Sequence, residues 1–431
     1  MSSILTNNGA MVALQTLQSI NKDMGATQSA ISTGKSVANA KDNSAVWAIS
    51  KQMESDVQGF KSIQESLALG ESTVAVARNA SETVTDLLTQ IKGKIVASQE
   101  DNVDREKIQT DITALRDQIG AVVGAAQFNG LNLLSNKETD AGSGSVDVLA
   151  SLDRSGSGVA SSSISVAKED LGIEKSNIAT GASVVATANN NVTGDGDAAV
   201  FAIAGAATAG TGTFTIGDDV AAGQGYQIAI TAGGGTVGAG FNTTAGDLNE
   251  ISYVARDGDT AADVAKGLTD AFNKYVKEAG LGDDSTVAAA STGGAVTITG
   301  ETGVAADAFS INVNSYAAAD TTIGGGLSDL ADIDVSSAEG SESALESIEG
   351  LIQTAIDSAA AFGSAEGRIE TQSDFISKLT DSLNSGIGSL VDANMEETSA
   401  RLQALQVQQQ LATQSLSIAN QAPQSILSLF R

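Results

Sequence analysis

The chain has 431 residues, and its 23 Lys and Arg against 52 Asp and Glu give a formal net charge of −29. This charge repels nucleic acid phosphates and anionic membrane surfaces, which excludes both as binding partners. Cysteine and histidine are absent, which excludes disulfides, thiolate nucleophiles, imidazole bases and Cys/His zinc sites.

The N-terminus lacks the basic start and unbroken apolar core of a signal peptide or a membrane span, so we expect neither. The single proline is Pro423, and the 46 glycines concentrate in the middle of the chain. This imbalance divides the sequence into two similar ends and a different centre.

The N-terminal stretch has helical spacing, and three sets of apolar residues recur at steps of three, four or seven. Gly34 interrupts the first helix, and Asp42 or Asn43 is expected to cap the second. The apolar sets are Leu17, Met24 and Ile31; Phe60, Leu67 and Val74; and Val84, Leu88, Ile91 and Ile95.

A third helix is expected to open at Asn102 or Asp104, because one face then carries apolar residues at helical spacing. Asn129 and Gly130 follow it and predict a tight turn where the chain reverses. The apolar face comprises Ile108, Ile112, Leu115, Ile119 and Val122.

The centre is predicted to consist of short strands in a Gly-rich setting, interrupted by one helix. Small β-hairpins are predicted around Val146, Val148 and Leu149, and around Ile164, Val166 and Leu171; further strands are predicted near Phe214, Tyr226, Ile251, Ala295 and Phe309. The helix is predicted over residues 260–277 with Thr260 as its cap, and its buried face comprises Ala262, Val264, Ala265, Leu268, Phe272, Tyr275 and Val276. The centre is thus predicted to be a small α+β domain.

The C-terminal stretch carries a seam with alternating steps of four and three and no break, which is typical of a coiled coil. Small or polar residues interrupt the seam and would weaken an isolated dimer, so this helix is expected to need further helical partners. The seam runs Val391, Met395, Thr398, Leu402, Leu405, Gln409, Ala412, Leu416 and Ala419.

Because a lone amphipathic helix cannot bury its own apolar stripe, the two helical ends are expected to pack together with the termini side by side. The predicted fold class is α+β: long N- and C-terminal helices form an antiparallel coiled-coil rod with a β-hairpin, and a β-rich α+β outer domain is inserted between them. A helix of roughly 60 residues would extend about 90 Å.

Four segments resemble the bacterial flagellins, a family whose ends are shared while the middle varies. They are AKDNSAVWAISKQM (Ala40–Met53), QFNGLNLL (Gln127–Leu134), AFGSAEGRIE (Ala361–Glu370) and ANQAPQSILSLFR (Ala419–Arg431). Together the similar regions cover about half of the chain.

The resemblance implies three layers: an inner helical tube (residues 1–40 with 390–431), a helical rod with a β-hairpin (41–176 with 327–389) and a surface-exposed outer domain (177–326). It further implies a secreted, extracellular subunit that polymerises with itself into the flagellar filament for swimming motility. Hook-filament junction proteins, a filament cap and an export chaperone are the implied partners. Catalytic residues, cofactors and metal sites are not expected.

The residues proposed to form the assembly seam are Leu17, Met24, Ile31, Val391, Met395, Leu402, Leu405 and Leu416. Periodicity alone leaves open whether such heptads form an intramolecular core or a contact between subunits, and the resemblance favours the second interpretation. The segment Leu88–Ser98 aligns with a helix that animal innate receptors grip in many flagellins. Gln90 and Gly93 replace the charges expected there, which predicts weak recognition.

Two alternatives remain. A hook-filament junction protein has related helical termini but does not form a long filament, and the C-terminal segment Ala419–Arg431 favours a flagellin over it. A secreted enzyme carried on an assembly scaffold would need a catalytic cluster of carboxylates or Ser and Lys, and no suggestive spacing is present.

Overall fold

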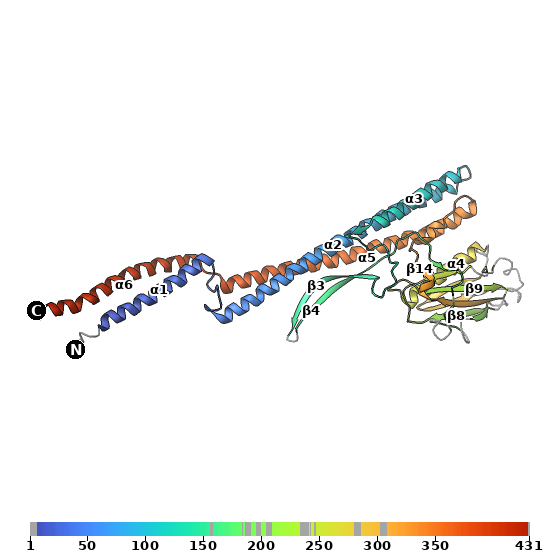
Figure 1. The fold of residues 1–431 in the computed structure, drawn as a ribbon. Helices are drawn as coiled ribbons and strands as arrows, with labels where there is room; N and C mark the ends of the chain where they lie inside the picture. The colour runs from blue at the N-terminus through green and yellow to red at the C-terminus, as the bar shows by residue number, and fades with distance from the viewer. Residues whose placement is uncertain are drawn as a thin grey trace. The chain divides into compact units, whose positions relative to one another are not determined.

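The computed structural model describes residues 7–155, 158–182, 184–185, 191–194, 200–203, 209–232, 241, 243–244, 247–279, 286–301 and 308–429. The chain divides into two compact units, and Figure 1 labels its helices and strands. The first comprises Met1–Ser66, Ser151–Ser162 and Gln372–Arg431, and the second comprises Leu67–Ala150 and Ser163–Thr371. Helices α2 (Ser44–Ser98) and α5 (Ala338–Val391) contribute residues to both units.

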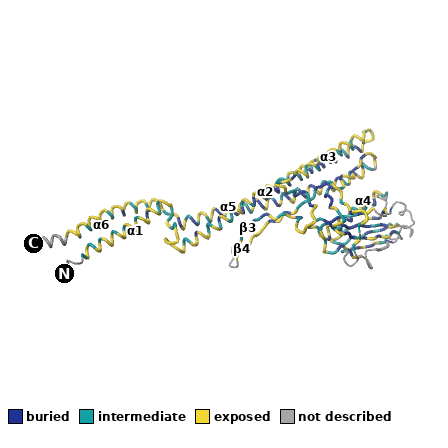
Figure 2. The backbone as a smooth tube through the Cα atoms, viewed as in Figure 1, coloured by how far each residue is buried: buried dark blue, intermediate teal, exposed yellow. Residues whose placement is uncertain are grey.

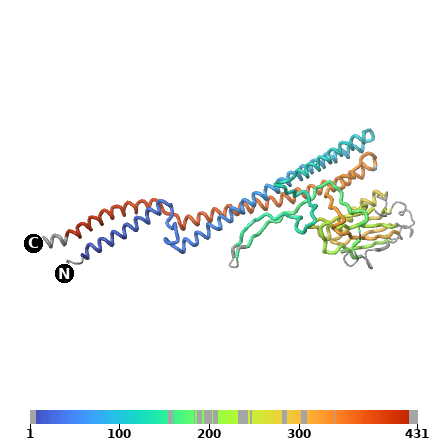
Figure 3. The backbone as a smooth tube through the Cα atoms, viewed as in Figure 1, coloured from blue at the N-terminus to red at the C-terminus, as the bar shows by residue number. Residues whose placement is uncertain are grey.

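The first unit contains the terminal helices α1 (Asn8–Thr33) and α6 (Met395–Leu429), which pack antiparallel. Asn7 Nδ2 donates to the backbone oxygen of Ala419 over 2.8 Å, and Gln409 Nε2 donates to Asn21 Oδ1 over 2.8 Å. Residues near the start of α1 therefore contact residues near the end of α6, and Figure 3 shows the two helices running side by side. The expected antiparallel packing of the termini is confirmed.

The junction between α1 and α2 follows the predicted breaks in the sequence. Gly34 adopts the left-handed conformation with φ of +70°, which favours glycine and ends α1. Asn43 Oδ1 accepts the backbone N–H of Val46 over 3.2 Å and caps α2, as predicted.

The C-terminal seam is not continuous, and the prediction of an unbroken helix from Val391 onward is wrong. Helix α5 ends at Val391, and α6 begins only at Met395. Between them, Ala393 donates its N–H to the oxygen of Gly34 over 2.9 Å. Asn394 Oδ1 then accepts the N–H of Glu396 over 3.2 Å, so a side-chain cap starts a new helix there.

In the second unit, the part of α2 from Leu67 onward turns its predicted apolar face inward: Leu67, Val74, Val84, Leu88, Ile91 and Ile95 are all buried. Its partner α5 runs antiparallel to it, because Arg78 pairs with Glu366 over 2.6 Å while Ser98 Oγ bonds Ser341 Oγ over 2.9 Å. Figure 2 shows that buried residues recur along α2 and α5.

Helix α3 (Arg105–Ala125) begins at Asp104, whose carboxylate accepts the N–H of Lys107 over 3.2 Å. The turn that follows joins β1 (Gln127–Phe128) to β2 (Leu131–Asn132), with positive φ at Asn129 (51°) and Gly130 (82°). Both predictions are confirmed.

One long hairpin replaces the several small ones that were predicted. Its strands are β3 (Ser145–Ser155) and β4 (Gly158–Ala167). The prediction missed its length because the Ser-rich start of β4 has no apolar alternation. Leu171, predicted near a strand, instead lies buried in the irregular segment after β4.

In the described part of residues 177–326, the predicted outer domain, two antiparallel four-stranded sheets and the helix α4 (Ala261–Glu278) enclose an apolar core. One sheet has the order β10-β9-β13-β7 and the other β11-β12-β8-β6. The bounds are β6 Val192–Gly194, β7 Val200–Ile203, β8 Thr211–Ile216, β9 Gly225–Ala232, β10 Ser252–Val254, β11 Ala288–Thr292, β12 Ala295–Thr299 and β13 Phe309–Tyr316.

The predicted strands near Phe214, Tyr226, Ile251, Ala295 and Phe309 are present as β8, β9, β10, β12 and β13, whereas β6, β7 and β11 were not predicted. They were missed because β6 and β7 are short and β11 is mostly alanine.

Helix α4 begins after the predicted cap Thr260, whose backbone N–H and hydroxyl donate to the Asp263 carboxylate over 2.8 and 2.6 Å. Its buried face differs from the prediction at three positions: Ala262 is exposed with Ala261 buried in its place, Tyr275 is only half-buried, and Thr269 is buried without having been predicted. The face is therefore shifted by one residue at the first turn, because Ala261 lies one turn before Val264 and Ala265.

Candidate assembly surface

The inward face of α6 is the predicted seam. From Met395 to Gln421, the buried or half-buried side chains are Thr398, Leu402, Leu405, Gln409, Ala412, Leu416 and Ala419, and all the others are exposed. This face packs against α1 of the same chain. The heptad pattern thus forms an intramolecular contact.

The structure brings together most of the proposed seam residues. Leu17, Met24 and Ile31 are half-buried on α1, Leu402 and Leu416 are half-buried on α6, and Leu405 is buried. Val391 lies elsewhere, at the end of α5, in a small cluster with Val57 and Ile387. Met395 is 45% exposed. A role for these eight residues between subunits stays a prediction.

The terminal helix pair also carries large apolar side chains on its outward surface, and these were missed by the sequence reasoning. On α6, Val407, Leu411 and Ile418 are 56%, 58% and 69% exposed. On α1, Met11 and Val12 are 60% and 63% exposed. Val407, Leu411 and Ile418 are spaced by four and seven residues, which places them on one stripe of α6 opposite the seam. This spacing is visible in the sequence and could have predicted the stripe.

A groove of about 460 Å³ lies between the two helices on one side of the pair. Leu411 and Val12 contribute to its wall, so the groove and the outward apolar residues are continuous. Its lining is Gly9, Val12, Ala13, Thr16 and Ile20 from α1, and Gln408, Leu411, Ala412 and Ser415 from α6. Contiguous exposed apolar surface of this kind is typical of a protein–protein contact.

The terminal pair is nearly uncharged. Helix α1 holds one cation and one anion, Lys22 and Asp23, and α6 holds Arg401 against Glu396 and Glu397, so their sum is (1 − 1) + (1 − 2) = −1. Since the whole chain carries −29, this is a region where a second copy can approach with little repulsion.

A charged cluster lies at the junction of α1 and α2. Lys51 and Lys35 approach the Glu54 carboxylate at 2.5 and 3.6 Å. The hydrogen bond from Lys51, followed by the charge of Lys35, holds the pKa of Glu54 below its ordinary value. These are surface ion pairs, and each stabilises the junction only slightly.

Within the described residues, no three His, Cys, Asp or Glu side chains are grouped so that they could hold a metal ion. No helix in the described part of the chain combines the length and apolar character needed to cross a membrane. The exposed apolar residues and the low charge of the terminal helices make their surface the best candidate for function.

Comparison with known proteins identifies the family. A sequence model of the bacterial flagellin N-terminal helical region matches residues 4–139, and one of the C-terminal helical region matches residues 345–430. Flagellin A of Rhizobium meliloti is 34% identical over the full length of both chains. The chain belongs to the bacterial flagellins. Flagellin B of Rhizobium meliloti is 35% identical, and the flagellin of Brucella melitensis biotype 1 is 29% identical, again with both chains fully covered.

Solved structures of two flagellar proteins also match the chain. The flagellar junction protein FlgL of Legionella pneumophila is 12% identical, with 80% of this chain and 98% of that chain covered and a TM-score of 0.31. FliC of Burkholderia pseudomallei is 13% identical, with 69% and 99% covered and a TM-score of 0.31. Scores of this size are too low to separate a filament subunit from a junction protein.

Proposed function

We propose that copies of this flagellin polymerise through the outward surface of the α1–α6 pair into the filament that drives swimming. The observation that supports this surface is the combination of exposed apolar residues, such as Leu411 and Ile418, with almost no charge. A helix that is apolar on both faces is typical of one surrounded by other helices. One face of α6 contacts α1, and the other would contact neighbouring copies.

The proposed layers of the subunit follow the ranges given by the resemblance. Residues 1–40 with 390–431 would line the inner tube, residues 41–176 with 327–389 would form the surrounding rod, and residues 177–326 would face solvent. The α1–α6 pair falls within the first of these layers, which agrees with its exposed apolar residues.

We further infer that the chain works outside the cell, as part of a flagellum, and functions mechanically without catalysis. Export through the flagellar secretion apparatus, an export chaperone, a filament cap and junction proteins at the base are the partners this role requires. The absence of cysteine and the single proline suit a chain that travels unfolded, because neither disulfides nor multiple slow proline isomerisations delay its folding.

The test is electron microscopy of the purified full-length chain after addition of short filament seeds or a precipitating salt. A variant that ends at Leu390, and so lacks α6, is the matched comparison. Long filaments from the full chain and none from the truncated chain are expected. Full-length chains that stay monomeric under every condition would overturn the proposal and favour a junction protein.

A further inference from the structure

The outer domain joins the rest of the second unit through two chain segments that lie beside each other. Strand β5 (Asn177–Ile178) enters the domain and β14 (Thr321–Thr322) leaves it, and the two pair antiparallel. Two adjacent short strands form a narrow connection. A domain held only in this way would pivot about it.

A second set of contacts surrounds this connection. Three irregular segments, residues 133–144, 168–176 and 323–337, hydrogen-bond to one another and are here called the collar. Glu169 donates its N–H to Leu133 O over 2.9 Å, and Leu327 donates to Gly172 O over 2.9 Å. Gln109 of α3 holds the collar from the other side, donating to Ile333 O over 2.9 Å.

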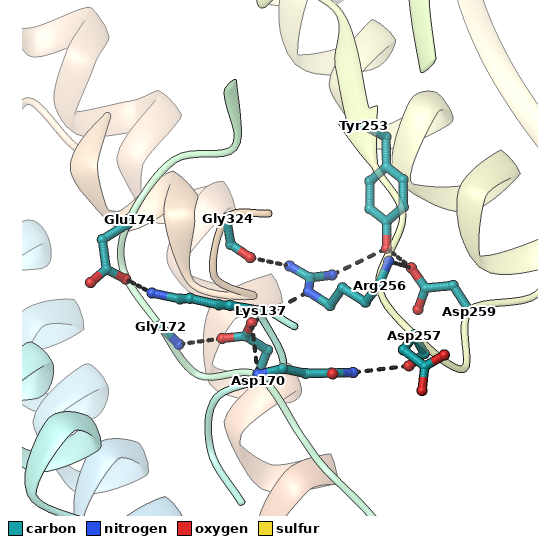
Figure 4. Close-up of polar contacts among 10 residues, drawn as sticks. Lys137, Asp170, Gly172, Glu174, Tyr253, Arg256, Asp257, Asp259 and Gly324 are labelled. Carbon is teal, nitrogen blue, oxygen red and sulfur yellow. Dashed lines mark hydrogen bonds and ion pairs between the residues drawn. The ribbon is translucent and has the colours of Figure 1, made fainter. Parts of the chain in front are cut away.

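Arg256 of the outer domain contacts the collar at its centre (Figure 4). Its Nη2 donates to the oxygen of Gly324 over 3.1 Å, and its Nε lies 3.5 Å from Asp170 Oδ2. The Arg256 and Asp170 side chains are only 18% and 3% exposed. The guanidinium is in turn held inside the outer domain, because its Nη1 donates to Tyr253 Oη over 3.1 Å.

The neighbouring residue strengthens the same contact. Asp257 accepts the backbone N–H of Gly144 on its side chain over 2.6 Å, and accepts Asn136 Nδ2 on its backbone oxygen over 3.0 Å. A Cβ atom at Gly144 would lie 2.2 Å from the backbone oxygen of Asp257. The close approach of the two backbones therefore requires glycine at position 144. Asp257 thus contacts the collar through both its side chain and its backbone oxygen.

A further charged contact lies along α4. Lys274 Nζ donates to Asp329 Oδ1 over 2.9 Å and to Asp332 Oδ2 over 2.6 Å, both in the collar. Lys277 lies 2.5 Å from Glu346 of α5. These contacts hold the outer domain along α4. Rotation of the domain about β5 and β14 would therefore break them together with the contacts of Arg256 and Asp257.

The polar contact at Arg256 is not arranged for maximal stability. Among the described residues, the buried atoms Asn136 Oδ1 and Arg256 Nε have no hydrogen-bond partner; the ion pair of Nε with Asp170 lacks hydrogen-bond geometry. A buried ion pair with incomplete hydrogen bonding stabilises a fold little compared with apolar side chains of similar size. Such a pair instead favours one orientation of the domain. In any other orientation, both charges would be buried without a partner, which is energetically costly.

We propose that Arg256 and Asp170 form an orientation lock, which fixes the outer domain on the collar so that it moves rigidly with α3 instead of pivoting on β5 and β14. The lock selects one orientation, and the apolar core of the domain supplies its stability. The proposal concerns the single chain and does not depend on polymerisation.

The test measures a distance in the full-length monomer. The natural chain has no cysteine, so spin labels can be attached at Gln118→Cys on α3 and Ser310→Cys on β13, both exposed positions. Pulsed electron resonance then gives the distribution of distances between them. The variants are Arg256→Met and the double variant Arg256→Met with Asp170→Asn, in which Asn retains an acceptor for the N–H of Gly172.

The matched control is Lys266→Met, which removes an ion pair with Asp270 on the exposed side of α4, where the two side chains are 73% and 61% exposed. One narrow distribution is expected for the parent and for this control, and a distribution at least twice as wide for both Arg256 variants. Circular dichroism monitors whether the domain stays folded.

Arg256→Met leaves Asp170 buried without its partner and can unfold the domain, so the double variant decides the outcome. A double variant that melts within a few degrees of the parent and shows the broad distribution supports the lock. A double variant with the parent's narrow distribution would overturn it, because the remaining contacts of Asp257, Lys274 and Lys277 and the packing would then set the orientation without the Arg256–Asp170 pair. Unfolding of the outer domain in the double variant would also overturn it, since the pair would then be a source of stability.

Discussion

Replacing two exposed apolar residues of α6 by glutamine, Leu411→Gln with Ile418→Gln, is expected to block filament growth while leaving the monomer folded. Both side chains lie opposite the face that packs on α1, and they are 58% and 69% exposed. Surface substitutions away from packed features change the free energy of unfolding by about 0.5 kcal/mol or less. The monomer should therefore keep its helical circular dichroism and its melting temperature.

The cost to the filament follows from the area that assembly would bury. Full burial of a Leu or Ile side chain contributes about 1.5–3 kcal/mol, and somewhat more than half of each side chain is available, so each contributes roughly 1–2 kcal/mol. The double variant then loses about 2–4 kcal/mol per subunit. Because about 1.4 kcal/mol corresponds to a factor of ten, the critical concentration should rise by roughly one and a half to three powers of ten.

Sedimentation of seeded samples across a range of protein concentrations measures the critical concentration directly. Gln403→Ala is the matched control, since Gln403 is exposed on the same helix but is polar, and it should polymerise like the parent. A double variant that polymerises at the parent's critical concentration would show that the outward stripe does not contact other subunits.

Three further predictions concern the second unit. A Cβ atom added at Gly70 would lie 2.6 Å from Val148 Cγ1, so Gly70→Ala should destabilise the chain by about 1–3 kcal/mol in thermal unfolding, and Val148→Ala in the same chain should recover most of it. Burial, followed by the charge of Asp357, raises the pKa of Glu169, so the charged carboxylate opposes folding. Stability should therefore fall as pH rises through the interval between the ordinary and the raised pKa. Glu169→Gln should then melt at a higher temperature than the parent at pH 7 and at the same temperature below pH 4; equal melting temperatures at both pH values would contradict this reasoning. Finally, purified monomer should activate innate-receptor reporter cells only weakly, because segment Leu88–Ser98 lacks the expected charges; full-strength activation would disprove this.

The seam illustrates what periodicity can and cannot predict. The half-buried or buried positions of α6 between Thr398 and Ala419 follow the predicted steps, because helix packing buries one residue every three or four. The break at residues 392–394 was missed because the step from Val391 to Met395 fits the same spacing by coincidence. Periodicity reports which face is apolar, and the cap at Asn394 decides where the helix starts.

The Arg256 contact could not be predicted in the same way. Its partners Asp170 and Gly324 lie far from it in sequence, and polar contacts between distant loops have no period. Arg256 lies in a short loop between β10 and α4 that carries no recognisable motif, so only the folded chain shows that it is buried. Gly144 gives no stronger signal, because glycine is common throughout this part of the sequence.

The distribution of charge links the two proposals. With α1 and α6 contributing −1, the rest of the chain carries −29 − (−1) = −28. Apolar burial between nearly neutral helices is strengthened by precipitating salts, which also screen the repulsion between the acidic remainders of neighbouring copies. Both effects act in the same direction, so assembly should require less protein as salt increases. An outer domain held in one orientation would then keep its charge at a fixed place in every copy, and the repulsion between finished filaments would be uniform along their length.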